Sequence, residues 1–332
     1  MTRLYRLNGE VKPLLKEICE IDVKDILENS FGYESIDSID EVDKDVDVAI
    51  VFNADAVVTD IADIIEFGEE LDESTVTNFG CYVIKGSVDF KQQADFDGVY
   101  SVTDIESVAS LSEDLRLSIL QKHVDFGVEF ESFDDVYIGK DVEIQGGAKI
   151  ERNVTIKGNS KIGKGAVIGS GSVIINAEVK AEADVKSSRL VDCVIGEKTT
   201  VGPYANIHTG SKIDSECRIG NFVEIKNSTL GYNTKSAHLA YIGDSDIGYK
   251  CNIGCGVIFV NYDGENKHRS VIGNGVFIGS NSNVVAPVNL KDGAYVAAGT
   301  TVTCDLPENC MCIGRSRETI KENRSKYHKL DK

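Results

Sequence analysis

The chain has 332 residues, of which 42% are apolar, and its 54 acidic and 35 basic side chains give a formal charge of −19. An acidic balance of this size argues against a nucleic-acid-binding protein, which needs clustered Lys and Arg to neutralise phosphates. The sequence has neither the apolar run of a signal peptide nor an apolar stretch of membrane-spanning length, so it predicts a cytoplasmic protein with no membrane contact.

The charge is unevenly distributed along the chain. Residues 1–135 contain 33 Asp and Glu against 10 Lys and Arg, a balance of −23. The remaining residues contain 21 acidic and 25 basic side chains, a balance of +4. Such an asymmetry predicts two parts that are built differently.

Residues 1–103 are predicted to form a small acidic α/β domain. A buried strand is expected at 46–52, a helix from 61 to 66 and a further strand at 81–84. Alternating strands and helices favour a parallel sheet. A linker helix is then predicted within the connection 104–135, because apolar residues recur at helical spacing at Val108, Leu111, Leu115 and Ile119.

A six-residue repeat organises the rest of the chain. An apolar side chain, most often Ile, recurs at every sixth position over 138–174, 195–225 and 272–302, usually with a small or β-branched residue two positions earlier. A period of six does not fit an α-helix or a simple hairpin, but it fits a solenoid of short strands and tight turns. The sequence therefore predicts a mainly β fold with a parallel β-helix over residues 136–303, followed by a C-terminal helical tail at 304–332.

The repeat is interrupted twice. Apolar spacing becomes irregular over 175–194, and a polar insertion, Val-Asn-Tyr-Asp-Gly-Glu-Asn-Lys-His-Arg, occupies 260–269. The insertion is either a solvated surface loop or a binding loop extruded beside the coils. The basic side chains of the tail are likewise either a solvated face or a source of positive charge for a phosphate-bearing ligand.

The nine cysteines are interpreted as reduced thiols. An odd number without a secretion signal does not indicate a disulfide framework. The close pairs Cys251/Cys255 and Cys310/Cys312 lack two further ligands at zinc-site spacing, so no metal site is expected.

Several segments between residues 201 and 315 are distinctive: Gly202-Pro-Tyr-Ala205, Gly220-Asn-Phe-Val-Glu-Ile-Lys226, Lys235-Ser-Ala-His-Leu-Ala-Tyr-Ile-Gly-Asp244, Asn252-Ile-Gly254, Asn261-Tyr-Asp-Gly264, Val285-Ala-Pro-Val288 and Ala297-Ala-Gly-Thr-Thr-Val302. They resemble the acetyltransferase domain of the bifunctional bacterial glucosamine-1-phosphate N-acetyltransferase/UDP-N-acetylglucosamine pyrophosphorylase, a hexapeptide-repeat acyltransferase. The resemblance implies a left-handed β-helix and a homotrimer with sites between subunits. It also implies acetyl transfer from acetyl-CoA to the 2-amino group of glucosamine 1-phosphate, in the synthesis of the cell-wall precursor UDP-N-acetylglucosamine.

The same resemblance implies roles for twelve residues. His238 matches the general base, and histidine is the side chain whose ordinary pKa lies nearest to neutral pH. The residues expected to bind the sugar phosphate are Lys226, Tyr241, Asn252, Lys267 and His208. The residues expected to contact the co-substrate acetyl-CoA are Asn261, Tyr262, Cys255, Ser280, Ala298 and Arg315. No metal is expected for this reaction.

One departure from the family leaves the acceptor open. His208 stands where the family has an Arg that makes a forked phosphate contact, and an imidazole cannot reproduce a bidentate guanidinium. The acceptor is therefore glucosamine 1-phosphate held more weakly, another amino sugar phosphate, or a nucleotide-linked amino sugar.

A second departure concerns residues 1–103. They are about half as long as the family's nucleotidyltransferase domain and lack its glycine-rich phosphate loop, so we interpret them as a shortened or replaced domain and expect no pyrophosphorylase activity. The lost loop also leaves open a non-catalytic trimeric scaffold or sensor. A carbonic anhydrase of the same fold is disfavoured, because its three zinc-binding histidines have no counterpart here.

Overall fold

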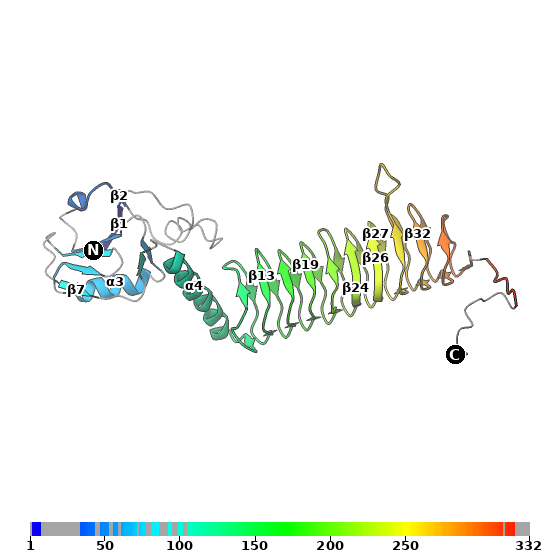
Figure 1. Ribbon diagram of the computed structural model, residues 1–332, viewed down its shortest axis with the longest axis horizontal. Helices are drawn as coiled ribbons and strands as arrows, with labels where there is room; N and C mark the ends of the chain where they lie inside the picture. Colours follow the sequence, from blue (N-terminus) through cyan, green and yellow to red (C-terminus); the bar gives the residue numbers. More distant parts are fainter. Residues whose placement is uncertain are drawn as a thin grey trace, which may run out of the picture. The chain divides into compact units, whose positions relative to one another are not determined.

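The computed structural model describes residues 2–7, 34–43, 47–52, 56–58, 61–71, 73–77, 81–85, 92–94, 99–101, 105–314 and 316–322 (Figure 1). The chain divides into two compact units, Met1–Ser118 and Ile119–Lys332. The predicted mainly β fold, built on a parallel β-helix, is confirmed. The predicted helical tail is wrong for the described residues after 303, which contain the strand Met311–Cys312 and no helix, because Met311 and Cys312 pair with the coil before them. In the described part of the chain, no helix is both long and apolar enough to cross a membrane.

The first unit contains a six-stranded sheet in the order β2-β1-β3-β6-β5-β7. Its strands are β1 (Thr2–Leu7), β2 (Glu34–Ile36), β3 (Val48–Phe52), β5 (Thr75–Thr77), β6 (Cys81–Ile84) and β7 (Gln92–Ala94). The other elements are the short helix η1 (Ile39–Glu41), the helix α3 (Ile61–Glu70) and the antiparallel pair β4 (Ala56–Val58) and β8 (Val99–Ser101).

The sheet is mixed, which corrects the predicted parallel sheet. Strand β1 is parallel to both β2 and β3, but β6 is antiparallel to both β3 and β5. The reversal at β6 follows from the short connection after β5, because a few residues can join antiparallel strands whereas a parallel pair needs a longer crossover. The strands and helix predicted at 46–52, 61–66 and 81–84 are otherwise present.

The predicted linker helix is α4 (Ile105–Asp125). Near its end Leu120 is fully buried and belongs to the hydrophobic core of the second unit. The last turns of the helix, from Ile119 on, therefore cover the N-terminal end of the core, as a solenoid core needs a cap at each end.

The β-helix has three faces, named A, B and C, whose strands stack in parallel from coil to coil. Face A consists of β10 (Tyr137–Ile138), β13 (Thr155–Lys157), β16 (Val173–Ile175), β19 (Arg189–Val191), β22 (Asn206–Ile207), β29 (Ile258–Val260), β32 (Asn283–Val285) and β35 (Thr301–Val302). Face B consists of β9 (Glu129–Phe130), β12 (Lys149–Ile150), β15 (Val167–Ile168), β18 (Asp184–Val185), β21 (Thr200–Val201), β28 (Asn252–Ile253), β31 (Phe277–Ile278), β34 (Tyr295–Val296) and β36 (Met311–Cys312). Face C consists of β11 (Glu143–Ile144), β14 (Lys161–Ile162), β17 (Glu178–Val179), β20 (Val194–Ile195), β23 (Lys212–Ile213), β25 (Thr229–Leu230), β27 (Ser245–Ile247), β30 (Ser270–Ile272) and β33 (Asn289–Leu290).

Two long strands, β24 (Arg218–Lys226) and β26 (Lys235–Gly243), run from face B through the corner into face A. Their first halves pair with face B strands and their second halves with face A strands. They consequently join faces A and B into one 19-stranded sheet, while face C forms a separate nine-stranded sheet. The corner between faces A and B is thus most regular at these two coils.

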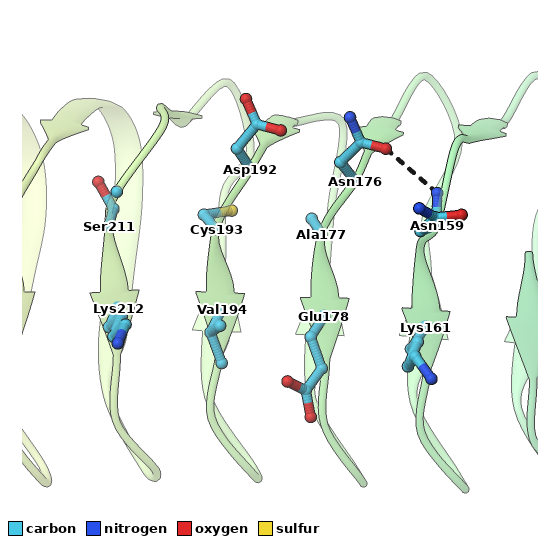
Figure 2. A pocket seen from close by; sticks show the side chains of 11 residues that line it. Asn159, Lys161, Asn176, Ala177, Glu178, Asp192, Cys193, Val194, Ser211 and Lys212 are labelled. Carbon is cyan, nitrogen blue, oxygen red and sulfur yellow. Dashed lines mark hydrogen bonds between the residues drawn. The ribbon is translucent and has the colours of Figure 1, made fainter.

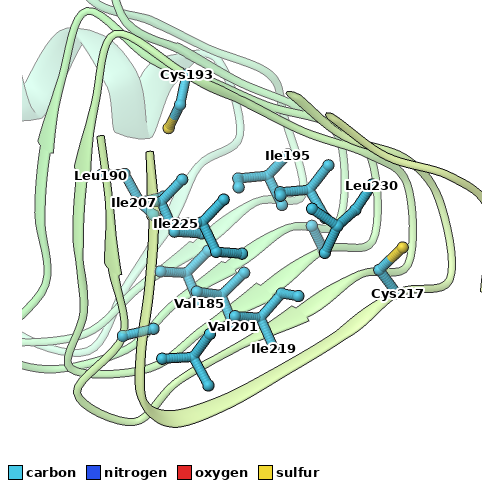
Figure 3. Packing of buried hydrophobic residues seen from close by; sticks show 14 of the residues in the cluster. Val185, Leu190, Cys193, Ile195, Val201, Ile207, Cys217, Ile219, Ile225 and Leu230 are labelled. Atoms are coloured by element: carbon cyan, nitrogen blue, oxygen red, sulfur yellow. The ribbon is translucent and has the colours of Figure 1, made fainter. Parts of the chain in front are cut away.

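The core is a stack of inward apolar side chains, one from each short strand. Figure 3 shows Val201 and Ile219 of face B packed near Ile207 and Ile225 of face A. All four side chains are at most 1% exposed. Burying one such side chain contributes roughly 1.5–3 kcal/mol, which explains why the sequence repeats a β-branched residue at this position.

The irregular segment 175–194 does not interrupt the stack. Strands β17, β18 and β19 pair with the coils on both sides, for example Ile174 with Leu190 and Val185 with Val201. Residues are lost only at the corners, so the apolar spacing changes while the inward positions remain aligned. By contrast, the insertion at 260–269 leaves the stack after Val260, which still pairs with Val285, and it protrudes beyond the coils (Figure 1).

Candidate functional site

His238 lies on β26 at the corner between faces B and A, and its side chain is exposed. Strand register is continuous on both sides of this corner, which places His238 level with Cys255, Ser280 and Ala298 on the next three coils. These three residues are also exposed. The small side chains therefore form a track, defined as residues 255, 280 and 298, that leads away from His238.

The backbone beneath the track is closely packed. A Cβ atom added at Gly254 would lie 2.6 Å from the backbone nitrogen of Ser280, and one added at Gly279 would lie 2.4 Å from that of Ala298. Real Cβ contacts are not this short, so only glycine permits the coils to approach each other here. The track thus combines small side chains with glycines that bring successive coils together.

Face A carries a second group of polar residues. His208 is level with Lys226 on the next coil, and its Nε2 atom lies 3.1 Å from Glu224 Oε1 and 2.9 Å from Asn206 Nδ2. Glu224 is in turn paired with Tyr241 in the strand register. The structure therefore brings His208, Lys226 and Tyr241 together around Glu224, a residue that sequence reasoning did not select although it lies inside the segment 220–226.

The protruding loop begins at the corner between faces A and C. Asn261 is only 7% exposed, and its amide nitrogen lies 3.4 Å from the Tyr241 hydroxyl and donates to Asp244. Tyr262 and Lys267 are exposed and form an antiparallel bridge across the base of the loop. Asn261 thus connects the loop with the polar group on face A.

Asp263 holds the tip of this loop in shape. Its carboxylate accepts from the backbone nitrogens of Asn266 at 2.7 Å and Glu265 at 2.8 Å, and it lies 2.6 Å from His268 Nε2. The backbone N–H of Asn266, then His268 and Glu265, hold the pKa of Asp263 well below its usual range. The Asp263 carboxylate therefore joins Glu265, Asn266 and His268 and fixes the conformation of the loop.

Arg269 anchors the other end of the loop to the coils. Its guanidinium binds the Asp246 carboxylate through two nitrogens and donates to the Asn227 carbonyl oxygen at 2.8 Å. The hydrogen bonds from Arg269 hold the pKa of Asp246 below its usual range. This forked ion pair spans adjacent coils of face C and fixes where the loop returns.

The predicted residues do not all converge in one chain. Lys226, Tyr241 and Asn261 lie on face A or at its far corner, whereas Asn252 lies on face B, paired in register with Lys235 and Phe277. His238 and the track lie on the corner between them. Arg315 is outside the described residues. A single chain consequently presents the predicted residues in two groups, here called half-sites, on opposite sides of one corner.

That corner also exposes large apolar side chains. Tyr204, Phe222 and Leu239 occupy successive coils, with exposed fractions of 61%, 59% and 58%. The first two rings stack with centroids 5.7 Å apart. All three residues have positive φ values, of 60°, 60° and 36°, where glycine or asparagine is usual. Three bulky apolar side chains therefore stand exposed next to one another on this corner, in a backbone conformation that such residues rarely adopt.

The cysteines of the described chain are all free. Burial raises the pKa of Cys193 to about 12 and that of Cys217 to about 11, which makes both thiols poor nucleophiles. No cluster of three or more metal-ligating side chains occurs in the described ranges. Cys255 alone among the thiols belongs to the track beside His238.

A shallow hollow of about 370 Å³ on face C lies on earlier coils than His238 (Figure 2). The residues that line it include the small side chains of Ala177, Cys193 and Ser211. Lys161 at its edge is paired with Glu143 at 2.9 Å. The hollow shares no residue with the half-sites, so it is separate from them.

Comparisons with known proteins identify the hexapeptide repeat. Residues 192–227 match the family described as bacterial transferase hexapeptide (six repeats). The chain is 38% identical over 227 residues to the bifunctional protein GlmU of Clostridium acetobutylicum, which covers 68% of this chain and 50% of that protein. The resemblance to GlmU is confirmed. Over a shorter stretch of 132 residues, the identity to GlmU of a Geobacillus species reaches 56%, covering 40% of this chain and 29% of that protein.

The coverage of these relatives is partial. The chain spans about half the length of the curated relatives it matches first. Among solved structures, the UDP-N-acetylglucosamine acyltransferase of Francisella novicida is similar with a TM-score of 0.41 at 20% identity, over 55% of this chain and 65% of that chain. The similarity to the curated relatives covers the C-terminal part of the chain, which contains the hexapeptide repeat.

Proposed function

We propose that the protein is an acetyl-CoA-dependent N-acetyltransferase that acts on the 2-amino group of an amino sugar phosphate, with glucosamine 1-phosphate as the first acceptor to test. The observation that carries the proposal is the exposed His238 at the head of the track formed by Cys255, Ser280 and Ala298. Small side chains leave room for a thin pantetheine arm to lie against the backbone, with its thioester near the imidazole. The similarity to GlmU supports this reading.

The reaction needs a base and an oxyanion donor. His238 would take a proton from the amino group as the nitrogen lone pair attacks the thioester carbon. The tetrahedral intermediate would be stabilised by donors near the carbonyl oxygen, such as the Ser280 hydroxyl. It would then collapse by breaking the carbon–sulfur bond, and the departing thiolate would receive a proton from the imidazolium. Amide and free CoA are the balanced products.

The sugar phosphate would occupy face A. Lys226 supplies a mobile positive charge for the phosphate, and the exposed Lys267 on the loop supplies a second. Tyr241 contributes a hydroxyl between them and His238. Asn252 and Tyr262 are proposed to complete the sugar and acetyl-CoA contacts, and Arg315 is proposed to meet a CoA phosphate.

The two half-sites support a homotrimer in which neighbouring chains complete each other's sites. The exposed ladder of Tyr204, Phe222 and Leu239 is the proposed contact between copies, since it lies on the corner that separates the half-sites. We also propose that the protein works in the cytoplasm. Its proposed functional divisions are residues 1–103, 104–135, 136–303 and 304–332.

The test is to incubate the purified chain with acetyl-CoA and glucosamine 1-phosphate and to detect the N-acetylated product by mass spectrometry. A His238→Gln variant keeps a hydrogen-bonding side chain of similar length without a titratable base, so its rate should fall about 100-fold or more. Product formation at the same rate in both proteins would refute the role of His238. Tight acetyl-CoA binding without any product would instead favour the non-catalytic sensor.

The contact between His208 and Glu224 favours a second candidate, the same chemistry on a different amino sugar. An imidazole held by a carboxylate at 3.1 Å is a weaker phosphate ligand than a forked guanidinium. A panel of amino sugar phosphates and nucleotide-linked amino sugars separates the two candidates. If glucosamine 1-phosphate is the acceptor, His208→Arg should lower its KM, whereas an unchanged or higher KM would favour another acceptor.

A further inference from the structure

Asp244 lies behind the candidate site, at the corner where β26 leaves face A. Its exposed fraction is 8%, and its φ of 46° is a left-handed value that Asp, Asn and Gly tolerate best. The carboxylate is nearly enclosed. Any effect that it has on a ligand must therefore pass through the residues it contacts.

Two asparagine side chains donate to this carboxylate from the coils on either side. Asn227 Nδ2 lies 2.5 Å from one carboxylate oxygen, and Asn261 Nδ2 donates to the other. The same nitrogen of Asn261 lies 3.4 Å from the Tyr241 hydroxyl oxygen. An ionised carboxylate only accepts hydrogen bonds, so it determines which end of each amide faces it. Both hydrogens of Asn261 Nδ2 are thereby directed inward, one to Asp244 and one to Tyr241.

The orientation of the Asn261 amide determines which hydrogen-bonding groups Asn261 and Tyr241 present to a ligand. The amide oxygen of Asn261 remains available to a ligand, because none of the described residues donates a hydrogen bond to it. The Tyr241 oxygen accepts from Asn261, so its own O–H hydrogen points elsewhere and is available for donation. The result is an acceptor at 261 beside a donor at 241.

We propose that Asp244 is a positioning residue that fixes this polarity for the bound substrates. The proposal rests on the proposed function, in which Asn261 faces acetyl-CoA and Tyr241 faces the sugar. The ligand group opposite Asn261 is then an N–H donor, either a pantetheine amide or the amino group of the acceptor. The group opposite Tyr241 is an oxygen of the sugar phosphate.

The negative charge of Asp244 is essential to this role. Arg269 supplies nearby compensation: its hydrogen bond to Asp246, and then the charges of Asp246 and Asp244, raise the pKa of its guanidinium. Asparagine at position 244 would have the same shape and the same tolerance of positive φ. The side chain of an asparagine at 244 would, however, also have an NH2 group that donates. Asn261 could then accept from it with its own oxygen and turn its NH2 group toward the ligand.

The variant Asp244→Asn tests the proposal in the full chain. We expect kcat/KM for acetyl transfer to fall about 10- to 100-fold, because a mismatched hydrogen bond leaves polar groups of the ligand and the site unpaired. The thermal midpoint should stay within a few degrees of that of the unmodified chain. The dissociation constant of acetyl-CoA, measured by calorimetry without acceptor, rises if the N–H belongs to pantetheine. It is unchanged, and the acceptor KM rises, if the N–H is the amino group.

The matched control is Asn227→Gly. It removes the other amide that binds the same carboxylate, and glycine suits the local φ of 47°. We expect its kcat/KM to stay within about threefold of the unmodified value. Equal kcat/KM in Asp244→Asn and the unmodified chain would overturn the proposal, as would an equal loss in both variants, which would indicate a structural role only. Absence of turnover in the unmodified chain refutes the proposed function itself, and the proposal on Asp244 then falls with it.

Discussion

Replacing Gly254 by Ala should disturb the coils at the track and little else. The added Cβ would meet the Ser280 backbone nitrogen at 2.6 Å and two further backbone atoms, of Gly279 and Ile278, at 2.8 Å. These are backbone atoms of the next coil, so no side-chain rotation relieves the contact, and the coils must separate locally by several tenths of an ångström. Overpacking of this kind costs about 1–3 kcal/mol.

The matched control is Gly139→Ala, which also follows an inward Ile of the repeat. Its Cβ would lie 3.6 Å from its nearest neighbour, an ordinary van der Waals distance. Alanine there should be neutral, or stabilising by about 0.4–1 kcal/mol, because it restricts the unfolded chain. The two variants therefore make the same chemical change with opposite predicted outcomes.

Differential scanning calorimetry and the acetyl-transfer assay measure these effects. Because a change of 1 kcal/mol shifts the midpoint of a unit of this size by roughly 2–4 °C, Gly254→Ala should melt about 2–12 °C lower. Its KM for acetyl-CoA should rise, since the track has widened. A Gly254→Ala chain as stable and as active as Gly139→Ala would refute the argument that close coil packing shapes the track.

Three further predictions concern other parts of the second unit. Phe222→Asp should convert the proposed trimer to monomers in analytical ultracentrifugation and abolish acetyl transfer, because it places a charge in the proposed contact; an active trimer would contradict that contact. The Asp246 pKa is lowered in the folded chain, so the Arg269 ion pair contributes stability above the unfolded carboxyl pKa of about 4 and loses it as the pH falls further. Hydrogen exchange at 260–269 should therefore accelerate only below about pH 4, and Arg269→Gln should remove that step; acceleration already at pH 6 would refute the assignment. The exposed Cys255 should react quickly with iodoacetamide and be protected by acetyl-CoA, whereas Cys193 should not react in the folded chain; equal labelling with and without acetyl-CoA would argue against the track.

The solenoid could be predicted from the sequence because its core is specified one coil at a time. Each inward Ile needs only its counterparts above and below, so a fixed period is sufficient information. Between 175 and 194 the corners shorten and the apolar period changes, yet Leu190 and Val185 still occupy inward positions.

The sheet of the first unit was harder to predict for a physical reason. The strands at 46–52 and 81–84 are apparent from their apolar residues, but their relative direction depends on how the connections run. A short connection after β5 reverses the chain and makes β6 antiparallel to both of its neighbours. The amino-acid composition of a strand does not indicate whether it runs parallel or antiparallel to its neighbours.

The polar residues of the candidate site also fall into two sets, those that the sequence predicts and those that only the structure identifies. Residues that lie within one recognisable segment, such as His238 and Tyr241, were selected from the sequence. Glu224 and Asp244 were not, although both belong to quoted segments, because what singles them out is a contact with another coil. Glu224 meets His208 from the preceding coil, and Asp244 meets Asn227 and Asn261 from either side. Such contacts depend on which residues of neighbouring coils lie side by side. This register changes along the chain because the corners differ in length.

The geometry of the corner also bears on the proposed sites between subunits. The strands β24 and β26 bend continuously from face B into face A, so side chains on the two halves diverge by the angle between the faces. Asn252 on face B and Lys226 on face A therefore point in different directions at this corner. A second copy packed against Tyr204 and Phe222 would turn that convex edge into one wall of a groove. Oligomerisation and catalysis are consequently expected to fail together when the ladder is disrupted, while the solenoid core, which lies wholly inside each chain, remains folded.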